Sequence, residues 1–134
     1  MSDLLKLSVP AKPEYVSLVR LAISSVANTI GFDVEAIEDI KIAMAEACNN
    51  AVLHGCKECS ENYEVEVCVN ENSLLIIVKD NGKGYNSLNY KEPDINCPKE
   101  GGLGIFIIKS LMDDVEIYSE NGKGTTIRMK KNIQ

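Results

Sequence analysis

The chain has 134 residues, a net charge of −6 and a pI of about 4.8, and these values exclude several classes of protein. A strongly acidic chain is repelled by nucleic acid and by anionic membranes, so we expect neither as a direct partner. No apolar run approaches the roughly 18 residues of a membrane span, and the N-terminus lacks the pattern of a signal peptide. The length favours a single domain over residues 1–134, and we expect it to be cytoplasmic.

Hydrophobic periodicity predicts the elements, because alternation marks strands and three- or four-residue spacing marks helices. We expect Gly31 to end the first helix and Asp33 to cap the second. Residues 85–100 show almost no periodicity and predict a loop, of a length that usually has a functional reason. In chain order the expected elements are a strand over 5–9, helices over 14–30 and 33–54, strands over 65–69 and 74–78, a helix over 104–112, and strands over 115–118 and 125–129.

Helices and strands are segregated along the chain rather than alternating, which predicts the α+β class. The strands expected over 65–69 and 74–78 are separated by a short turn at Glu71 and Asn72, and this spacing is typical of an antiparallel hairpin. The predicted architecture is a two-layer sandwich in which a mainly antiparallel, mixed sheet carries helices on one face.

The second helix carries an acid and an amide, Glu46 and Asn50, one turn apart on the side opposite its core face. Ile42, Ala43 and Leu53 surround them, which predicts a sheltered cleft rather than a plain solvated face. A sheltered carboxylate can act as a general base, and an amide oxygen suits Mg²⁺, which takes hard oxygen ligands. The alternative is that both are ordinary surface residues.

An Asp-led glycine turn follows the apolar strand over 74–78. Ionised Asp80 accepts hydrogen bonds and can therefore recognise an exocyclic amine such as that of adenine. Gly82 and Gly84 allow the backbone to approach a ligand closely. Thr125 and Thr126 begin the last strand, where strand propensity explains them, although a hydroxyl there can also reach a base. The alternative for Asp80 is a simple turn that ends a strand.

A second glycine-rich segment, Gly101-Gly102-Leu103-Gly104, lies between the long loop and the third helix. Glycines at a helix N-terminus expose backbone N–H groups to phosphate, and Lys99 is close enough to move in with the loop. A flexible hinge is the alternative. The segment is neither a Walker A sequence nor a Rossmann fingerprint, because no Gly-Lys-Ser/Thr follows it and no strand runs directly into it.

The acid–amide pair, the Asp-led turn and the glycine-rich helix start together predict a pocket for a magnesium–nucleotide. The other candidates are weaker. Cys56 and Cys59 form one CxxC near His54, but no second pair completes a zinc site. Five cysteines are an odd number without a framework spacing, so we expect reduced thiols.

These motifs resemble those of the anti-sigma factor serine-protein kinases, above all the RsbW type (anti-sigma-B factors), with SpoIIAB as a near relative. The resemblance covers almost the whole chain, from about residue 9 to residue 130. The segments that carry it are Val9–Val16, Glu38–Ala43, Glu46–Val52, Gly101–Gly104, Leu111–Val115 and Gly124–Thr126.

The resemblance implies the GHKL, or Bergerat, ATP-binding fold, which histidine kinases, gyrase and MutL share. It implies that ATP and Mg²⁺ bind and that residues 85–100 form a lid over the nucleotide. It implies that Glu46 is the general base and that Asn50 is the magnesium ligand. On the adenine side it implies that Asp80 reads the base together with Gly82 and Gly84, and that Thr125 or Thr126 supplies a supporting hydroxyl. It also implies partner contact for Arg20 and phosphate-side contacts for Lys99, Gly102, Leu103 and Gly104.

The function implied by the resemblance is partner switching. The protein would bind and inhibit an RNA polymerase sigma factor, and as a serine/threonine kinase it would phosphorylate an antagonist of the STAS type. A homodimer is implied as well. The alternative is an ATP-binding anti-sigma module without kinase activity. The ATPase domain of a histidine kinase and a thiol redox protein are further alternatives, and the chain has no room for the helical pair that carries a phosphoacceptor histidine.

Overall fold

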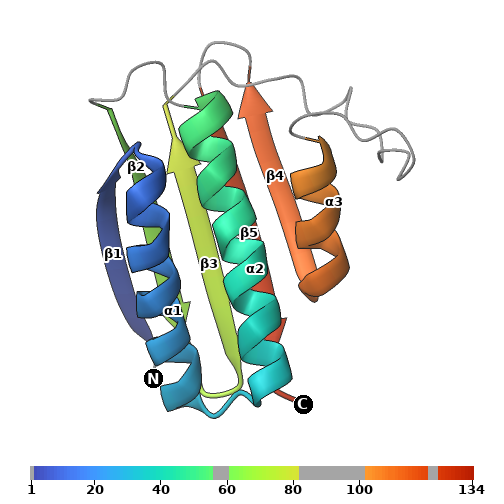
Figure 1. The fold of residues 1–134 in the computed structure, drawn as a ribbon. Coiled ribbons are helices and arrows are strands. Elements are labelled where there is room, and N and C mark those ends of the chain that lie inside the picture. The colour runs from blue at the N-terminus through green and yellow to red at the C-terminus, as the bar shows by residue number, and fades with distance from the viewer. Residues whose placement is uncertain (1, 56–60, 82–101, 121–123) are drawn as a thin grey trace.

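The computed structural model describes residues 2–55, 61–81, 102–120 and 124–134, and it arranges them in two layers (Figure 1). One layer is a five-stranded sheet, and the three α-helices all cover the same face of it. The α+β prediction, with helices on one face, is confirmed. The elements are β1 (Asp3–Pro10), η1 (Pro13–Tyr15), α1 (Val16–Ile30), α2 (Val34–Asn50), η2 (Ala51–Gly55), β2 (Asn62–Val69), β3 (Ser73–Asp80), α3 (Gly102–Leu111), β4 (Asp114–Glu120) and β5 (Gly124–Asn132).

The sheet has the strand order β1-β2-β3-β5-β4, and each of its four described strand pairs is antiparallel. The expected hairpin is present, with Val65 opposite Val78. No parallel pair occurs among the described strands, so the expected mixed character is absent from that part. The last strand, β5, inserts between β3 and β4, and this insertion places Asp80 opposite Thr125.

The helix ends follow local chemistry as predicted. Gly31 ends α1 in the left-handed region at φ 108°, which costs glycine little because it has no Cβ. Asp33 begins α2, and its Oδ1 accepts a hydrogen bond from the backbone N–H of Ala36 at 2.8 Å. The first helix differs slightly from the prediction, because residues 13–15 form a 3₁₀ turn and the α-helix begins at Val16.

The core lies between the helices and the sheet, and α2 contributes its central face. Ile40, Met44 and Cys48 on that face are fully buried. Burial raises the pKa of the Cys48 thiol to about 12, and a hydrogen bond with the Tyr63 side chain opposes only part of that rise. The thiol is therefore protonated at neutral pH and is not a nucleophile. Cys48 and Cys68 are both free thiols, as expected for these two.

None of the helices in the described ranges has the length and apolar character needed to cross a bilayer.

Candidate functional site

Four elements meet at one end of the molecule because of the directions in which they run (Figure 1). Helix α2 and strand β3 end there, while strand β5 and helix α3 begin there. Both chain termini lie at the opposite end. The arrangement brings together residues that are far apart in the sequence: Glu46 and Asn50 near the end of α2, Asp80 at the end of β3, Thr125 at the start of β5 and Gly104 in the first turn of α3.

Glu46 and Asn50 are both half-buried on α2. A Cβ atom built on Gly104 would lie 3.0 Å from Oε2 of Glu46, so the first turn of α3 lies directly against this carboxylate. The expected shelter by neighbouring apolar residues is wrong in part, because Ile42 and Leu53 are exposed. The third helix, rather than those side chains, shields the acid.

A wide helical turn follows Asn50 directly. Residues 51–55 continue α2 as the π-helix η2, and the backbone N–H of Ala51 is shared between the carbonyl oxygens of Ala47 and Cys48. Such turns are rare and occur frequently at functional sites. The apolar pattern predicts one continuous helix to residue 54, and nothing in the local residue types indicates this wider turn.

Asp80 is buried, with 6% of its surface exposed, and its carboxylate is held from the neighbouring strand. Its Oδ1 accepts a hydrogen bond from the backbone N–H of Thr125 at 3.2 Å. Thr125 is 3% exposed, and its Oγ1 lies 2.9 Å from Oγ of Ser119 on β4. The ends of three strands are thus linked through Asp80, Thr125 and Ser119.

Gly124 permits this linkage. It adopts φ 91°, in the left-handed region, and a Cβ atom there would overlap the carbonyl oxygen of Asp80 and lie 3.0 Å from Cα of Asn81. Neither Gly124, which the sequence marked only within the family segment Gly124–Thr126, nor Ser119 was predicted to shape the site. The signal available for Gly124 was a glycine directly before paired threonines. The role of Ser119 depends on the register between β4 and β5, which no local pattern specifies.

The structure separates the two candidate threonines. Buried Ile127 and Met129 face the helices, and alternation along β5 places Thr125 on that same face. Thr126 shares the opposite, open face of the sheet with Arg128. Thr125 therefore lies on the side of the helices and Thr126 on the other side, and a supporting role for either hydroxyl at the base stays a prediction.

The remaining candidates divide into described and undescribed positions. Gly102 begins α3, so the N-terminus of that helix is directed to the site end, and Leu103 is half-buried beside it. Arg20 is exposed on α1. The candidates Gly82, Gly84 and Lys99, the loop over 85–100, and the cysteines at 56, 59 and 97 lie outside the described residues.

The donor chemistry of the site suits Mg²⁺ better than a transition metal. The described ranges contain no group of three or more His, Cys, Asp or Glu side chains that could hold a metal ion by themselves. Mg²⁺ needs no such cage, because it is bound through one or two protein oxygens, waters and the phosphates of its nucleotide. The half-buried amide oxygen of Asn50 fits that mode.

In the described ranges, an antiparallel sheet with a buried aspartate at a strand end carries a covering helix with an acid–amide pair at the same end of the molecule. The family model described as the histidine kinase-like ATPase domain matches residues 9–131, so the chain is an ATPase domain of that family. Among solved structures, the RsbU and RsbW domains of a Mycobacterium tuberculosis protein superpose with a TM-score of 0.73 at 21% identity, covering 97% of this chain and 32% of that one. A blue-light activated histidine kinase from Erythrobacter litoralis gives a TM-score of 0.58 at 18% identity, covering 92% and 61%.

Sequence relatives give the narrower family. The serine-protein kinase RsbW of Listeria monocytogenes serotype 4a is 43% identical over 131 residues, covering 91% of this chain and 83% of the relative. That of Bacillus cereus is 41% identical over 138 residues, covering 97% and 85%. The chain belongs to the RsbW family of serine-protein kinases, which confirms the resemblance drawn from the motifs.

Proposed function

We propose that this protein is an ATP-dependent serine/threonine kinase and anti-sigma factor. It binds and inhibits an RNA polymerase sigma factor, and it phosphorylates the STAS-type antagonist that would release that factor. One observation carries the proposal: Glu46 and Asn50 sit half-buried at the end of α2 against the first turn of α3, at the end of the molecule where Asp80 and Thr125 also lie.

Each described residue has a part in the transfer. The Asp80 carboxylate accepts a hydrogen bond from the exocyclic amine of adenine, and the N-terminus of α3 receives the phosphates. Asn50 would hold Mg²⁺, and the bound ion would neutralise phosphate charge. The serine oxygen of the antagonist attacks the γ-phosphorus, its proton passes to Glu46, and ADP is the leaving group. Such a transfer depends mainly on positioning and charge stabilisation.

The transfer assay separates this function from its alternative. Purified protein is incubated with γ-labelled ATP and a STAS-type antagonist protein, with and without Mg²⁺. We expect label on a serine or threonine of the antagonist only when Mg²⁺ is present. If the protein binds ATP and the sigma factor but leaves the antagonist unlabelled, it is an ATP-binding anti-sigma module without kinase activity.

The exposed face of α1 is the surface that we assign to binding of the sigma factor. Arg20 is exposed on this helix, and the fold also leaves two leucines of the same two turns in solvent, Leu18 at 59% and Leu21 at 70% exposure. Exposed apolar side chains together with an arginine are typical of a contact surface. The cation also suits an acidic group on the partner.

Reversing the charge of Arg20 tests that assignment. Arg20→Glu is expected to weaken binding of the sigma factor by about tenfold or more, because it places like charges together at the contact. Lys109→Glu on α3 makes the same change in net charge elsewhere and serves as the control. Calorimetric titration with the sigma factor measures both, and equal affinities for the two variants would contradict the assignment.

The proposal extends to a cytoplasmic homodimer. Strand β1 is an edge of the described sheet and carries two exposed leucines, Leu4 and Leu5. Edge strands present unpaired backbone groups that a second chain can pair with. This edge supports assembly of two copies.

A further inference from the structure

We infer that Gly104 is a positioning residue for Glu46: its missing side chain leaves the space that the catalytic carboxylate occupies. The inference rests on the proposed kinase function. The contact itself is direct, because a Cβ atom on Gly104 would lie 3.0 Å from Oε2 of Glu46. Carbon and oxygen atoms in ordinary contact lie farther apart than this, at about 3.5 Å.

The backbone does not explain the glycine. Gly31 and Gly124 are the glycines with positive φ in the described ranges, and Gly104 has a conformation that any residue adopts within a helix. Glycine is also among the poorest residues for a helix interior, where alanine is the best. A helix only ten residues long therefore carries an unfavourable residue at the position that faces Glu46.

Helix α3 is anchored, so an added methyl group would displace the carboxylate rather than the helix. Ile105 and Ile108 of α3 are buried. At the far end, Nζ of Lys131 donates a 2.6 Å hydrogen bond to the carbonyl oxygen of Leu111 and lies 3.8 Å from Oδ2 of Asp39 on α2. These contacts tie α3 to both α2 and β5. The half-buried Glu46 side chain has rotatable bonds and is therefore the member of the pair that we expect to yield.

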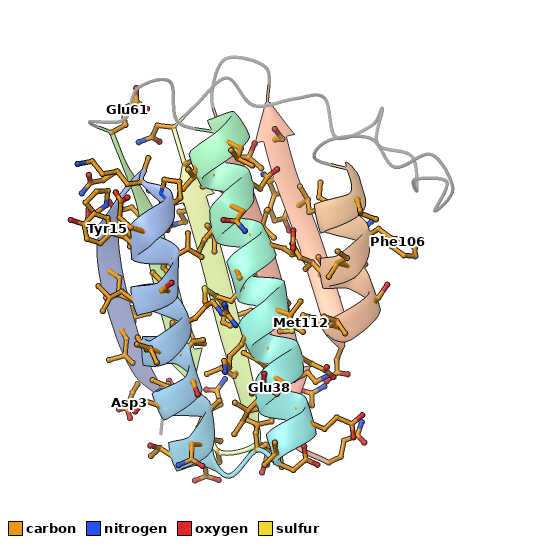
Figure 2. All side chains as sticks on the ribbon, in the orientation of Figure 1. Asp3, Tyr15, Glu38, Glu61, Phe106 and Met112 are labelled. Carbon is orange, nitrogen blue, oxygen red and sulfur yellow. The ribbon has the colours of Figure 1, made fainter. Side chains whose placement is uncertain are left out.

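Phosphate binding and base positioning make different demands on this residue. A role for Gly104 in holding phosphate depends on its backbone N–H, which alanine retains. A role in positioning Glu46 depends on the empty volume, which alanine removes. Phe106, two residues after Gly104, points away from α2 (Figure 2). The side of α3 that faces away from Glu46 therefore accepts a large side chain.

The test is Gly104→Ala in the full-length protein. We expect transfer to the antagonist to fall roughly tenfold to a hundredfold, since a base displaced by a fraction of an ångström leaves its reactive geometry. The Kd for ATP should stay within about threefold, because the groups that bind the ground state remain. The melting temperature should be equal or higher, since alanine favours the helix. Ser110→Ala, at an exposed position of the same helix, is the control and should behave as the parent protein.

Coupling to Glu46 distinguishes positioning from a general structural effect. In a Glu46→Gln background, where no base remains, Gly104→Ala should cause no additional loss of transfer. An undiminished second loss would overturn the inference, as would unchanged transfer in the single variant or a loss of ATP binding that accounts for the whole defect.

A spectroscopic measurement keeps this test independent of the kinase assay. The ¹³C signal of the Glu46 carboxyl carbon, recorded without nucleotide or partner, should move in Gly104→Ala and stay in place in Ser110→Ala. An unmoved signal overturns the inference whatever the activity. If the signal moves while Glu46→Gln still transfers phosphate normally, the proposed role of Glu46 as base has failed, and positioning of a base by Gly104 falls with it.

Discussion

Replacing Glu46 with glutamine is expected to lower phosphoryl transfer by about 10²–10⁴-fold, the range that a positioned general base contributes. Glutamine has nearly the same shape as glutamate and fits the space beside Gly104, so the packing of α2 against α3 is retained. Its amide oxygen does not accept the proton of a serine hydroxyl as a carboxylate does. The Kd for ATP should therefore change little, and the loss should appear in the rate of the chemical step.

Single-turnover transfer and calorimetric ATP binding together measure this effect. Glu38→Gln is a matched control, because it makes the same chemical change on the same helix. Glu38 is exposed and forms a 3.2 Å ion pair with Lys41, and such surface pairs contribute only about 0–1 kcal/mol to stability. We expect this control to transfer phosphate at the parental rate. Parental transfer by Glu46→Gln would instead reject Glu46 as the base.

Local chemistry explains why much of the fold was predictable. Gly31 and Asp33 act as helix caps through groups within a few residues of themselves, and the period of the apolar residues identified the helices and strands. The same reasoning placed Glu46 and Asn50 one turn apart on one side of the helix, and in the structure that side flanks the core face. These features depend on neighbours in the chain, so a single sequence contains the information needed to infer them.

Contacts between distant segments were not predictable in this way. The link between Thr125 and Ser119 depends on the register of two strands, and the contact between Glu46 and Gly104 depends on how α3 docks on α2. The two threonines show the limit clearly. Residue type makes Thr125 and Thr126 equivalent, and only the position of β5 within the sheet decides which one faces the helices.

Replacing Gly124 with alanine is expected to damage both the stability and the nucleotide site. The left-handed backbone costs a residue with a Cβ about 1–2 kcal/mol, and the overlap with the Asp80 carbonyl oxygen adds about 1–3 kcal/mol of strain. Relief of that overlap must separate the ends of β3 and β5. The hydrogen bond from the Thr125 N–H to the Asp80 carboxylate lies at this point, so that hydrogen bond is lost and the carboxylate is displaced.

Gly31→Ala is the control that separates the cost of the left-handed backbone from the cost of the steric overlap. Gly31 also has a positive φ, at 108°, but a Cβ atom there meets no other atom within 4 Å. Denaturant unfolding should show the backbone cost alone for this control and a larger loss for Gly124→Ala. Under conditions where both variants are folded, ATP affinity should fall about 10–100-fold only in Gly124→Ala, as expected for a misplaced charged hydrogen-bonding group worth about 1.5–3 kcal/mol. Equal ATP affinities in the two variants would mean that Asp80 does not read the adenine, because the strand end that carries it would have moved without consequence for binding.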